Sequence, residues 1–233
     1  MEQQDVLQGI GRNATAGISL LLVGFSISLL LINQGQFVDE ADNLVVGFLM
    51  QNGESLYKDL FSHHFPMAYL WVAMVIQLVG KSIFAVRLSI LVFQFFSLAA
   101  IMRISNAYLP VGITGLIWGL LRVFYKGHMV LYSSIAGICV AVVFCLTLLF
   151  LLDVIKFDFK LALFFSVYAT IAFLSDPLTV YCLFLSLVFI ALKSTRWAVV
   201  SATIIFTGVG LYVTYLLLSG SYDSFFEQVI RFN

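Results

Sequence analysis

An all-α, polytopic membrane protein is the fold class that the sequence predicts, from its composition, its hydropathy and its lack of chain breaks. Hydrophobic residues make up 62% of the 233 residues and charged residues 10%, whereas soluble domains average about 45–50% and about 25%. The mean hydropathy is +1.06. With only 3 prolines, no disordered linker divides the chain, so we expect residues 1–233 to form a single transmembrane module. A net charge of zero offers no basic surface to nucleic acid.

About seven membrane-spanning helices are expected, because a span needs roughly 20 apolar residues. The first apolar run, 14–32, is long enough to span, and no small-residue cleavage site follows it, so we interpret it as a span and not as a signal peptide. The apolar stretch 160–192 contains Asp176 and Pro177 near its middle. Because proline breaks a helix, we expect two short helices there. The other expected spans are 84–104, 108–125, 130–152 and 197–218.

The segment 40–53, in the first loop (33–83), has the pattern of an amphipathic helix. Apolar residues recur at i, i+3, i+4, i+7 and i+8, which places them on one helical face, so the helix is expected to lie in the membrane interface. We expect Asp39 to cap its start and Gly53 its end. The apolar face comprises Ala41, Leu44, Val45, Phe48 and Leu49, with Glu40, Asn43 and Gly47 off it.

The segment 66–79 predicts a second helix in the same loop. Pro66 suits a first helical position and Gly80 a terminus. About 14 residues at 1.5 Å each give roughly 21 Å, which is short of a ~30 Å hydrocarbon core. We therefore expect this helix to lie on the outer surface without crossing. Lysine and arginine do not decide the matter, because six of the 12 fall on each side in either topology.

An acidic pair, Asp39 and Glu40, directly follows the first expected span. Carboxylates at a membrane boundary are costly to desolvate, which favours a functional role. One of them can accept a proton while its neighbour binds substrate, so we take the pair as the catalytic candidates. The alternative is that Asp39 only caps a helix and Glu40 is a solvated interface residue.

Other polar residues of the first loop are candidates for binding a donor or an acceptor. Two neighbouring histidines can supply a hydrogen-bond donor, a proton shuttle or a phosphate contact. No cofactor is expected, and a divalent metal held by Asp59 and His64 is the less favoured alternative, because no ligand spacing here is diagnostic. The candidate binding residues of this loop are Tyr57, Lys58, Asp59, His63 and His64.

Cationic residues at the expected outer ends of helices form a second group of candidates. Such side chains can grip a lipid phosphate through charge-assisted hydrogen bonds. The alternative, for any one of them, is ordinary snorkelling to lipid head groups. The group comprises Arg87, Arg122 and Lys126, with His128 beside them.

The first loop resembles the GT-C superfamily of integral membrane glycosyltransferases, and within it the bacterial aminoarabinose-transferase-like and protein-mannosyltransferase-like enzymes. The resemblance covers roughly residues 38–91, and beyond them only hydropathy agrees. It rests on the acidic pair after the first span and on the residues that follow it, namely Asn52 with Gly53, Tyr57 with Asp59, His64 with Pro66, Tyr69, and Gly80 with the run from Phe84 to Leu88.

The resemblance implies a seven-span module whose first outer loop carries two juxtamembrane helices and the catalytic acid. It implies that Asp39 is the general base toward the acceptor, that Glu40 is its partner, and that His64 lies near the donor phosphate. The implied donor is a polyprenyl-phosphate sugar and the implied acceptor a lipid or a glycan. The implied location is the plasma (inner) membrane, with the active loop facing outside.

Departures from the family keep two other functions open. Relatives are typically longer, and some carry a further acid where this chain has Tyr132 to Ser134, or a lysine where it has Asp176. A truncated or degenerate member, which binds a lipid-linked sugar without catalysis or is completed by a second chain, is therefore the alternative. A small transporter or flippase is less favoured, because it needs ionisable residues deep in the spans and here they cluster at helix ends.

Overall fold

The structure, a computed structural model, describes residues 2–35, 37–122, 124, 126–127 and 129–231, with the backbone alone for 2–12. Within these residues the chain forms ten α-helices and no β-strand, so the all-α prediction is confirmed. Two compact units are present. The first comprises Met1–Gly35 and Arg87–Met129, and the second comprises Gln36–Val86 and Val130–Asn233.

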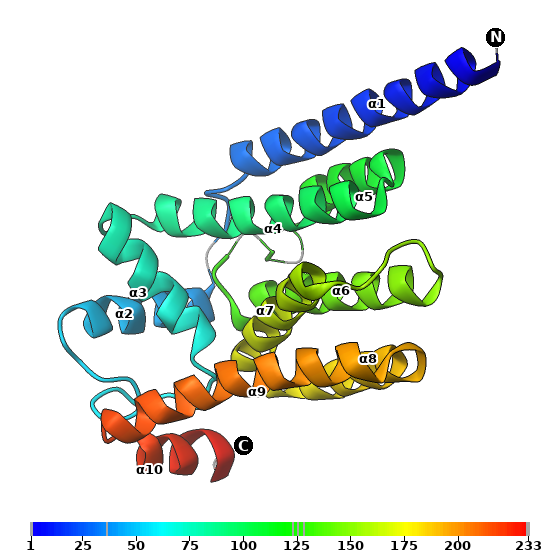
Figure 1. Cartoon of the computed structure of the whole chain (residues 1–233). Coiled ribbons are helices and arrows are strands. Elements are labelled where there is room, and N and C mark those ends of the chain that lie inside the picture. The colour runs from blue at the N-terminus through cyan, green and yellow to red at the C-terminus, as the bar shows by residue number, and fades with distance from the viewer. Residues whose placement is uncertain (1, 36, 123, 125, 128, 232–233) are drawn as a thin grey trace. The chain divides into compact units, whose positions relative to one another are not determined.

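The first unit is built on helices α1 (Glu2–Leu30) and α5 (Tyr108–Leu121), which pack along one another (Figure 1). Their backbones meet at glycines. A Cβ on Gly112 would lie 2.6 Å from the Cα of Gly17, and a Cβ on Gly119 would lie 2.6 Å from the Cα of Gly24. Small residues permit this approach, which gives membrane helices their van der Waals contact.

Helix α4 (Ile83–Ser105) contributes the rest of the first unit's core from Arg87 onward. Its Phe95 ring packs edge-on against Phe25 of α1, with ring centroids 5.5 Å apart. Gln94 is fully buried, accepts from Trp118 Nε1 at 3.3 Å and donates to the Gly127 carbonyl at 2.9 Å. Both ends of this buried amide are therefore paired, as a buried polar group requires.

The second unit begins with α2 (Val38–Gln51) and α3 (Met67–Val79), which pack together. Pro66 precedes α3, and Gly80 follows it with φ +85°, as predicted. The buried residues of α2 are Glu40, Asn43, Val46 and Gly47. The polar side of this helix thus faces protein, while Val45 on the predicted apolar face is exposed. That arrangement leaves the apolar face for lipid.

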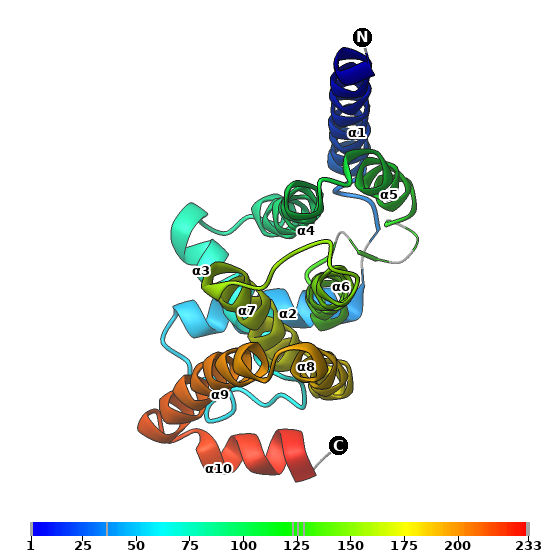
Figure 2. The same ribbon diagram turned by 45° about the vertical axis from the view of Figure 1, so that its right-hand side comes forward.

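The remaining helices of the second unit pack as neighbours, α6 against α7 and α8, and α9 against both α7 and α8 (Figure 2). After α9 the chain turns at Gly220, with φ +69°, into a short terminal segment. The elements are α6 (Tyr132–Leu151), α7 (Phe159–Ser175), η1 (Pro177–Thr179), α8 (Val180–Lys193), α9 (Thr195–Leu218), α10 (Tyr222–Phe225) and the π-helical η2 (Phe226–Arg231).

The break expected in 160–192 is confirmed. Helix α7 ends at Ser175, and the Asp176 side chain accepts from the backbone N–H of Leu178 at 2.9 Å. Asp176 therefore caps the short helix that starts at Pro177.

Four described helices are long and apolar enough to cross a membrane, namely Asn13–Leu30, Ile83–Ser105, Tyr132–Leu151 and Thr195–Leu218. Membrane insertion is thus supported. The count is below seven because the other helices expected to span are short: α5 and α8 have 14 residues each and α7 has 17.

Candidate functional site

The acidic pair lies in the first turn of α2, at the start of the second unit. The residue before the helix is Phe37, and no side chain caps it. The prediction that Asp39 caps this helix is therefore wrong, because the helix starts at Val38 and Asp39 is its second residue. Both carboxylates still lie where the helix dipole favours negative charge.

Glu40 is buried, 3% exposed, and its Oε1 accepts from the backbone N–H of Val130 at 3.3 Å. Asn43, one turn later, donates to the Val130 carbonyl at 2.8 Å. The two side chains share one helical face, and they take up both backbone groups of Val130. Glu40 thus holds the segment that leads into α6, and the alternative that it is a solvated residue is wrong.

His64 lies between the acidic start of α2 and the start of α6. Its ring stacks on Tyr132, with ring centroids 5.0 Å apart, and the His63 ring centroid is 4.0 Å away. Burial, and then neighbouring His63, lower the pKa of His64, while the charges of Asp39 and Asp42 oppose the shift. The half-buried Asp39 is therefore close enough for its charge to act on this imidazole.

A chain of hydrogen bonds joins α2 to the histidines through α3. Tyr69, fully buried, donates to Asp42 Oδ2 at 3.2 Å. Ser62 Oγ lies 2.7 Å from the Tyr69 hydroxyl and accepts from the backbone N–H of His64 at 3.1 Å. If the Tyr69 hydroxyl donates to Asp42, then the Ser62 hydroxyl donates to Tyr69. Each hydroxyl proton in this series of hydrogen bonds then has one acceptor. Sequence reasoning missed Asp42, although its i, i+3 spacing from Asp39 places both on one side of a helix.

Residues 55–64, which we call the site loop, contain the other predicted binding residues. Tyr57 is buried, and its hydroxyl donates to the His64 carbonyl at 2.8 Å. Asp59 is exposed and accepts from the Ser55 N–H at 2.8 Å, and Lys58 is exposed. Tyr57 and Asp59 thus shape the loop, while Lys58 and the half-buried histidines remain accessible to a ligand.

The predicted phosphate-binding cations all belong to the first unit. Arg87 is 4% exposed and donates to the carbonyls of Ile32 and Gly35, at 3.0 and 3.1 Å, just beyond α1. Arg122 is fully buried and donates to the Gly127 carbonyl at 3.0 Å, while its Nε and Nη1 have no partner among the described residues. Lys126 is half-buried with φ +56°, and His128 lies outside the described residues. Their role toward a lipid phosphate stays a prediction.

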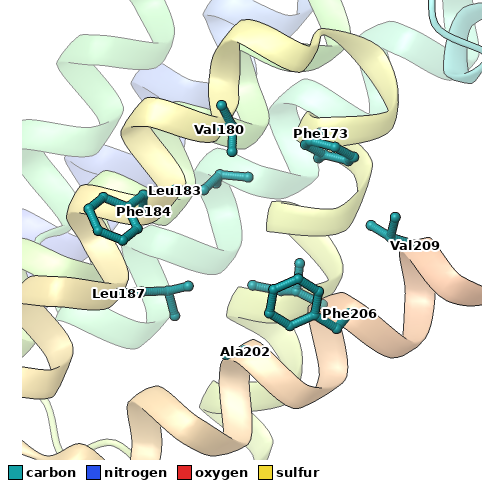
Figure 3. A pocket seen from close by; sticks show the side chains of 9 residues that line it. Phe173, Val180, Leu183, Phe184, Leu187, Ala202, Phe206 and Val209 are labelled. Atoms are coloured by element: carbon teal, nitrogen blue, oxygen red, sulfur yellow. The ribbon is translucent and has the colours of Figure 1, made fainter.

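An apolar pocket of about 170 Å³ opens between α7, α8 and α9 in the second unit (Figure 3). Phe173 lines it at the end of α7. The same ring packs edge-on against Phe65, the residue after His64, with ring centroids 5.9 Å apart. The pocket is therefore joined to the site loop through two phenylalanines. Its other lining residues are Val180, Leu183, Phe184, Leu187, Ala202, Ile205, Phe206 and Val209.

Metal ligands do not gather in the part of the chain that the structure describes, where no three His, Cys, Asp or Glu side chains lie close enough to hold an ion. Asp59 and His64, the pair named for a metal, make separate contacts, Asp59 to Ser55 in the site loop and His64 to Tyr132 at the start of α6.

The lowered pKa of His64 predicts a pH dependence of stability. The folded state binds this proton less readily than the unfolded state, so the neutral imidazole stabilises the fold fully above the ordinary value of about 6.5. That stability is lost as the pH falls through the lowered pKa. We expect the unfolding midpoint in detergent to fall more between pH 7 and pH 5 for the wild type than for His64→Gln. Identical slopes would contradict the prediction.

The resemblance over residues 38–91 stays a prediction. No family model, no curated protein and no solved structure matches the chain, and its function is therefore argued from the residues of the site.

Proposed function

We propose that the chain is a membrane glycosyltransferase that moves a sugar from a polyprenyl-phosphate donor to an acceptor at the outer face of the plasma (inner) membrane. One observation carries the proposal. Asp39 and Asp42 of α2 lie near the two histidines of the site loop. This loop is in turn joined to an apolar pocket. A carboxylate base beside hydrogen-bond donors, with an apolar pocket adjoining, suits a substrate with a phosphate head and a hydrocarbon tail.

Asp39 is the proposed general base. It accepts the proton of an acceptor hydroxyl while that oxygen attacks the anomeric carbon of the donor sugar. The bond from the anomeric carbon to the phosphate oxygen breaks, and the polyprenyl phosphate leaves with the electron pair. Asp39 is half-buried, so it is reachable by a substrate. Glu40 supports it by holding the Val130 backbone.

The two histidines are the proposed contacts of the donor phosphate. Because its pKa is lowered, His64 is neutral at pH 7 and offers a hydrogen bond in place of a charge. Its ring is in contact with those of Tyr132 and His63. A preorganised donor of this kind stabilises charge that develops on the leaving oxygen.

The pocket between α7, α8 and α9 is the proposed place for part of the polyprenyl tail. Its lining is apolar throughout, and Phe65 with Phe173 connects it to His64. A polyprenyl tail is already surrounded by hydrocarbon in the bilayer, so the pocket would hold it by van der Waals contact and fit. The head and the tail of a lipid-linked sugar would thus bind to neighbouring parts of one unit.

The direction of α1 and α5 supports a topology of seven spans. Gly17 meets Gly112 and Gly24 meets Gly119, so the two helices run parallel. These are the first and third spans when α3 stays at the surface, and alternate spans are parallel. If α3 crossed the membrane, α1 and α5 would be antiparallel.

The terminal segment supports the same topology. The side chain of Gln228 in η2 accepts from the Ser62 N–H at 2.9 Å, so this segment and the site loop lie on one side. A topology of seven spans would place the terminal segment and the site loop outside, whereas eight spans would place them on opposite sides of the membrane. Helix α7, and η1 together with α8, reach the lower bound of about 17 residues for a span, whereas α5 has 14 residues and is counted as a span for its parallel packing against α1.

The topology predicts where a reporter will lie. A reporter fused after Asn233 is expected outside the cell. The same reporter inserted at Lys156, in the loop after α6, is expected in the cytoplasm and serves as the control. Accessibility to an impermeant cysteine reagent at both positions provides the measurement. A cytoplasmic C-terminus would rule out seven spans.

Transfer from a labelled polyprenyl-phosphate sugar by the purified wild type tests the function. The expected result is labelled acceptor together with free polyprenyl phosphate in equal amounts. Binding of the donor without transfer, even when a second membrane chain is supplied, would identify a degenerate, non-catalytic member. Movement of the intact donor between leaflets without transfer would identify a flippase.

A further inference from the structure

The terminal segment η2 is hydrogen-bonded to the site loop through the side-chain amide of Gln228. Its Nε2 donates to the carbonyl of Tyr57 at 2.7 Å, and its Oε1 accepts from the N–H of Ser62 at 2.9 Å. Gln228 is half-buried, and its neighbour Val229 is 2% exposed. One amide therefore bridges two backbone positions of the site loop and uses a donor and an acceptor in doing so.

The first of these positions is strained. Tyr57 has φ +69°, a left-handed conformation that L-residues other than glycine rarely adopt. It is held by its own N–H, which donates to the Leu60 carbonyl at 2.9 Å, and by its hydroxyl, which donates to the His64 carbonyl. Such conformations persist only when surrounding contacts determine them. Gln228 supplies the contact on the Tyr57 carbonyl.

The second position leads directly to the site. Ser62 accepts from the backbone N–H of His64 and contacts the Tyr69 hydroxyl, which in turn donates to Asp42. Phe225, just before η2, adds edge-on contacts to Tyr57 and Phe65, with ring centroids 5.0 and 5.8 Å away. The terminal segment thus contacts the site loop at Tyr57 and Ser62 and the residue that follows the loop, Phe65.

We propose that Gln228 is a positioning residue, which fixes the site loop and through Ser62 sets the place of His64 and Tyr69. The proposal rests on the proposed function only where it concerns transfer. The positioning itself has physical consequences that need no substrate. Since one hydrogen bond shifts such an equilibrium by about fivefold, loss of both hydrogen bonds of the amide will raise local opening of the site loop by roughly thirtyfold.

Hydrogen–deuterium exchange of the full chain in detergent tests the positioning. Gln228→Leu removes both hydrogen bonds, and we expect amides of residues 55–64, above all that of Ser62, to exchange about thirtyfold faster. Glu227→Gln is the matched control, since Glu227 is exposed and pairs only with Arg231 among the contacts of the described residues. Its exchange in the site loop should equal that of the wild type.

A second variant separates the two bonds. Gln228→Glu keeps an acceptor for the Ser62 N–H but carries no donor for the Tyr57 carbonyl at neutral pH. It should accelerate exchange in the same direction by a smaller factor, and it provides the test if Gln228→Leu does not fold. Unchanged exchange in the site loop in both variants would overturn the proposal.

Histidine titration distinguishes positioning of the site from simple anchoring of η2. The pKa of His64 is lowered mainly by burial, with His63 adding and Asp39 and Asp42 opposing. A released site loop exposes the ring, so in Gln228→Leu the pKa of His64 should rise toward its ordinary value. A His64 titration identical to that of the wild type would overturn the proposal even if η2 itself were loosened. If the wild type transfers no sugar, the proposed function fails while exchange and titration still decide the role of Gln228.

Discussion

Replacing Asp39 by asparagine is expected to reduce sugar transfer by about 10²–10⁴-fold, the usual effect of removing a general base. Asparagine keeps the size and shape of the side chain but cannot accept the proton at neutral pH. No helix cap is lost, because Phe37 occupies the N-cap position. Loss of a first-turn charge changes stability by only about 0.3–1 kcal/mol, so insertion and folding should be normal.

The measurement is transfer from a labelled polyprenyl-phosphate sugar at equal amounts of folded protein. Glu54→Gln is the matched control, because Glu54 is an exposed carboxylate of the first loop that is not among the candidate catalytic or binding residues. It should transfer at nearly the wild-type rate. Wild-type turnover by Asp39→Asn would exclude Asp39 from catalysis.

A methyl group placed between α1 and α5 is expected to destabilise the first unit. In Gly112→Ala the new Cβ would lie 2.6 Å from the Cα of Gly17, a backbone atom that cannot move aside without parting the helices. Overpacking typically costs about 1–3 kcal/mol per site. The double variant Gly112→Ala with Gly119→Ala should lose more stability than either single variant but less than their sum, because both sites lie on one helix contact and parting the helices at one relieves the other.

Gly137→Ala is the matched control for this test. Gly137 lies on α6, where an added Cβ meets no atom within 4 Å. The same substitution should there be neutral or stabilising, since alanine is the better helix former. Thermal unfolding in detergent, together with the distance between spin labels on α1 and α5, measures the effect. Equal stability of the Gly112 and Gly137 variants would show that the glycines do not set this contact.

Local features of the fold could be predicted because the residues that cause them are adjacent in the chain. Pro66 and Gly80 bound α3, and Asp176 with Pro177 divides the apolar stretch into two helices. The start of α2 was misplaced for a related reason. Asp39 is a good capping residue, but the backbone becomes helical one residue before it, at Val38.

The contacts that build the site could not be predicted, because their partners are distant in sequence. Glu40 binds a backbone group 90 residues away, and Arg87 binds one 55 residues away. Backbone N–H and C=O groups carry no sequence signal, so a charged side chain that pairs with them looks unpaired in the sequence. The polar face of α2 was visible, but only the packing shows that it faces protein.

The bond between Gln228 and Tyr57 spans 171 residues, and this has a consequence for how the protein is made. At about 5–20 residues per second, the ribosome needs roughly 10–30 s to add that length of chain. The site loop therefore leaves the ribosome long before its partner exists. During biogenesis the first loop therefore lacks these contacts until α9 is inserted and the terminal segment has been synthesised. The site is then the last part of the second unit to fold completely.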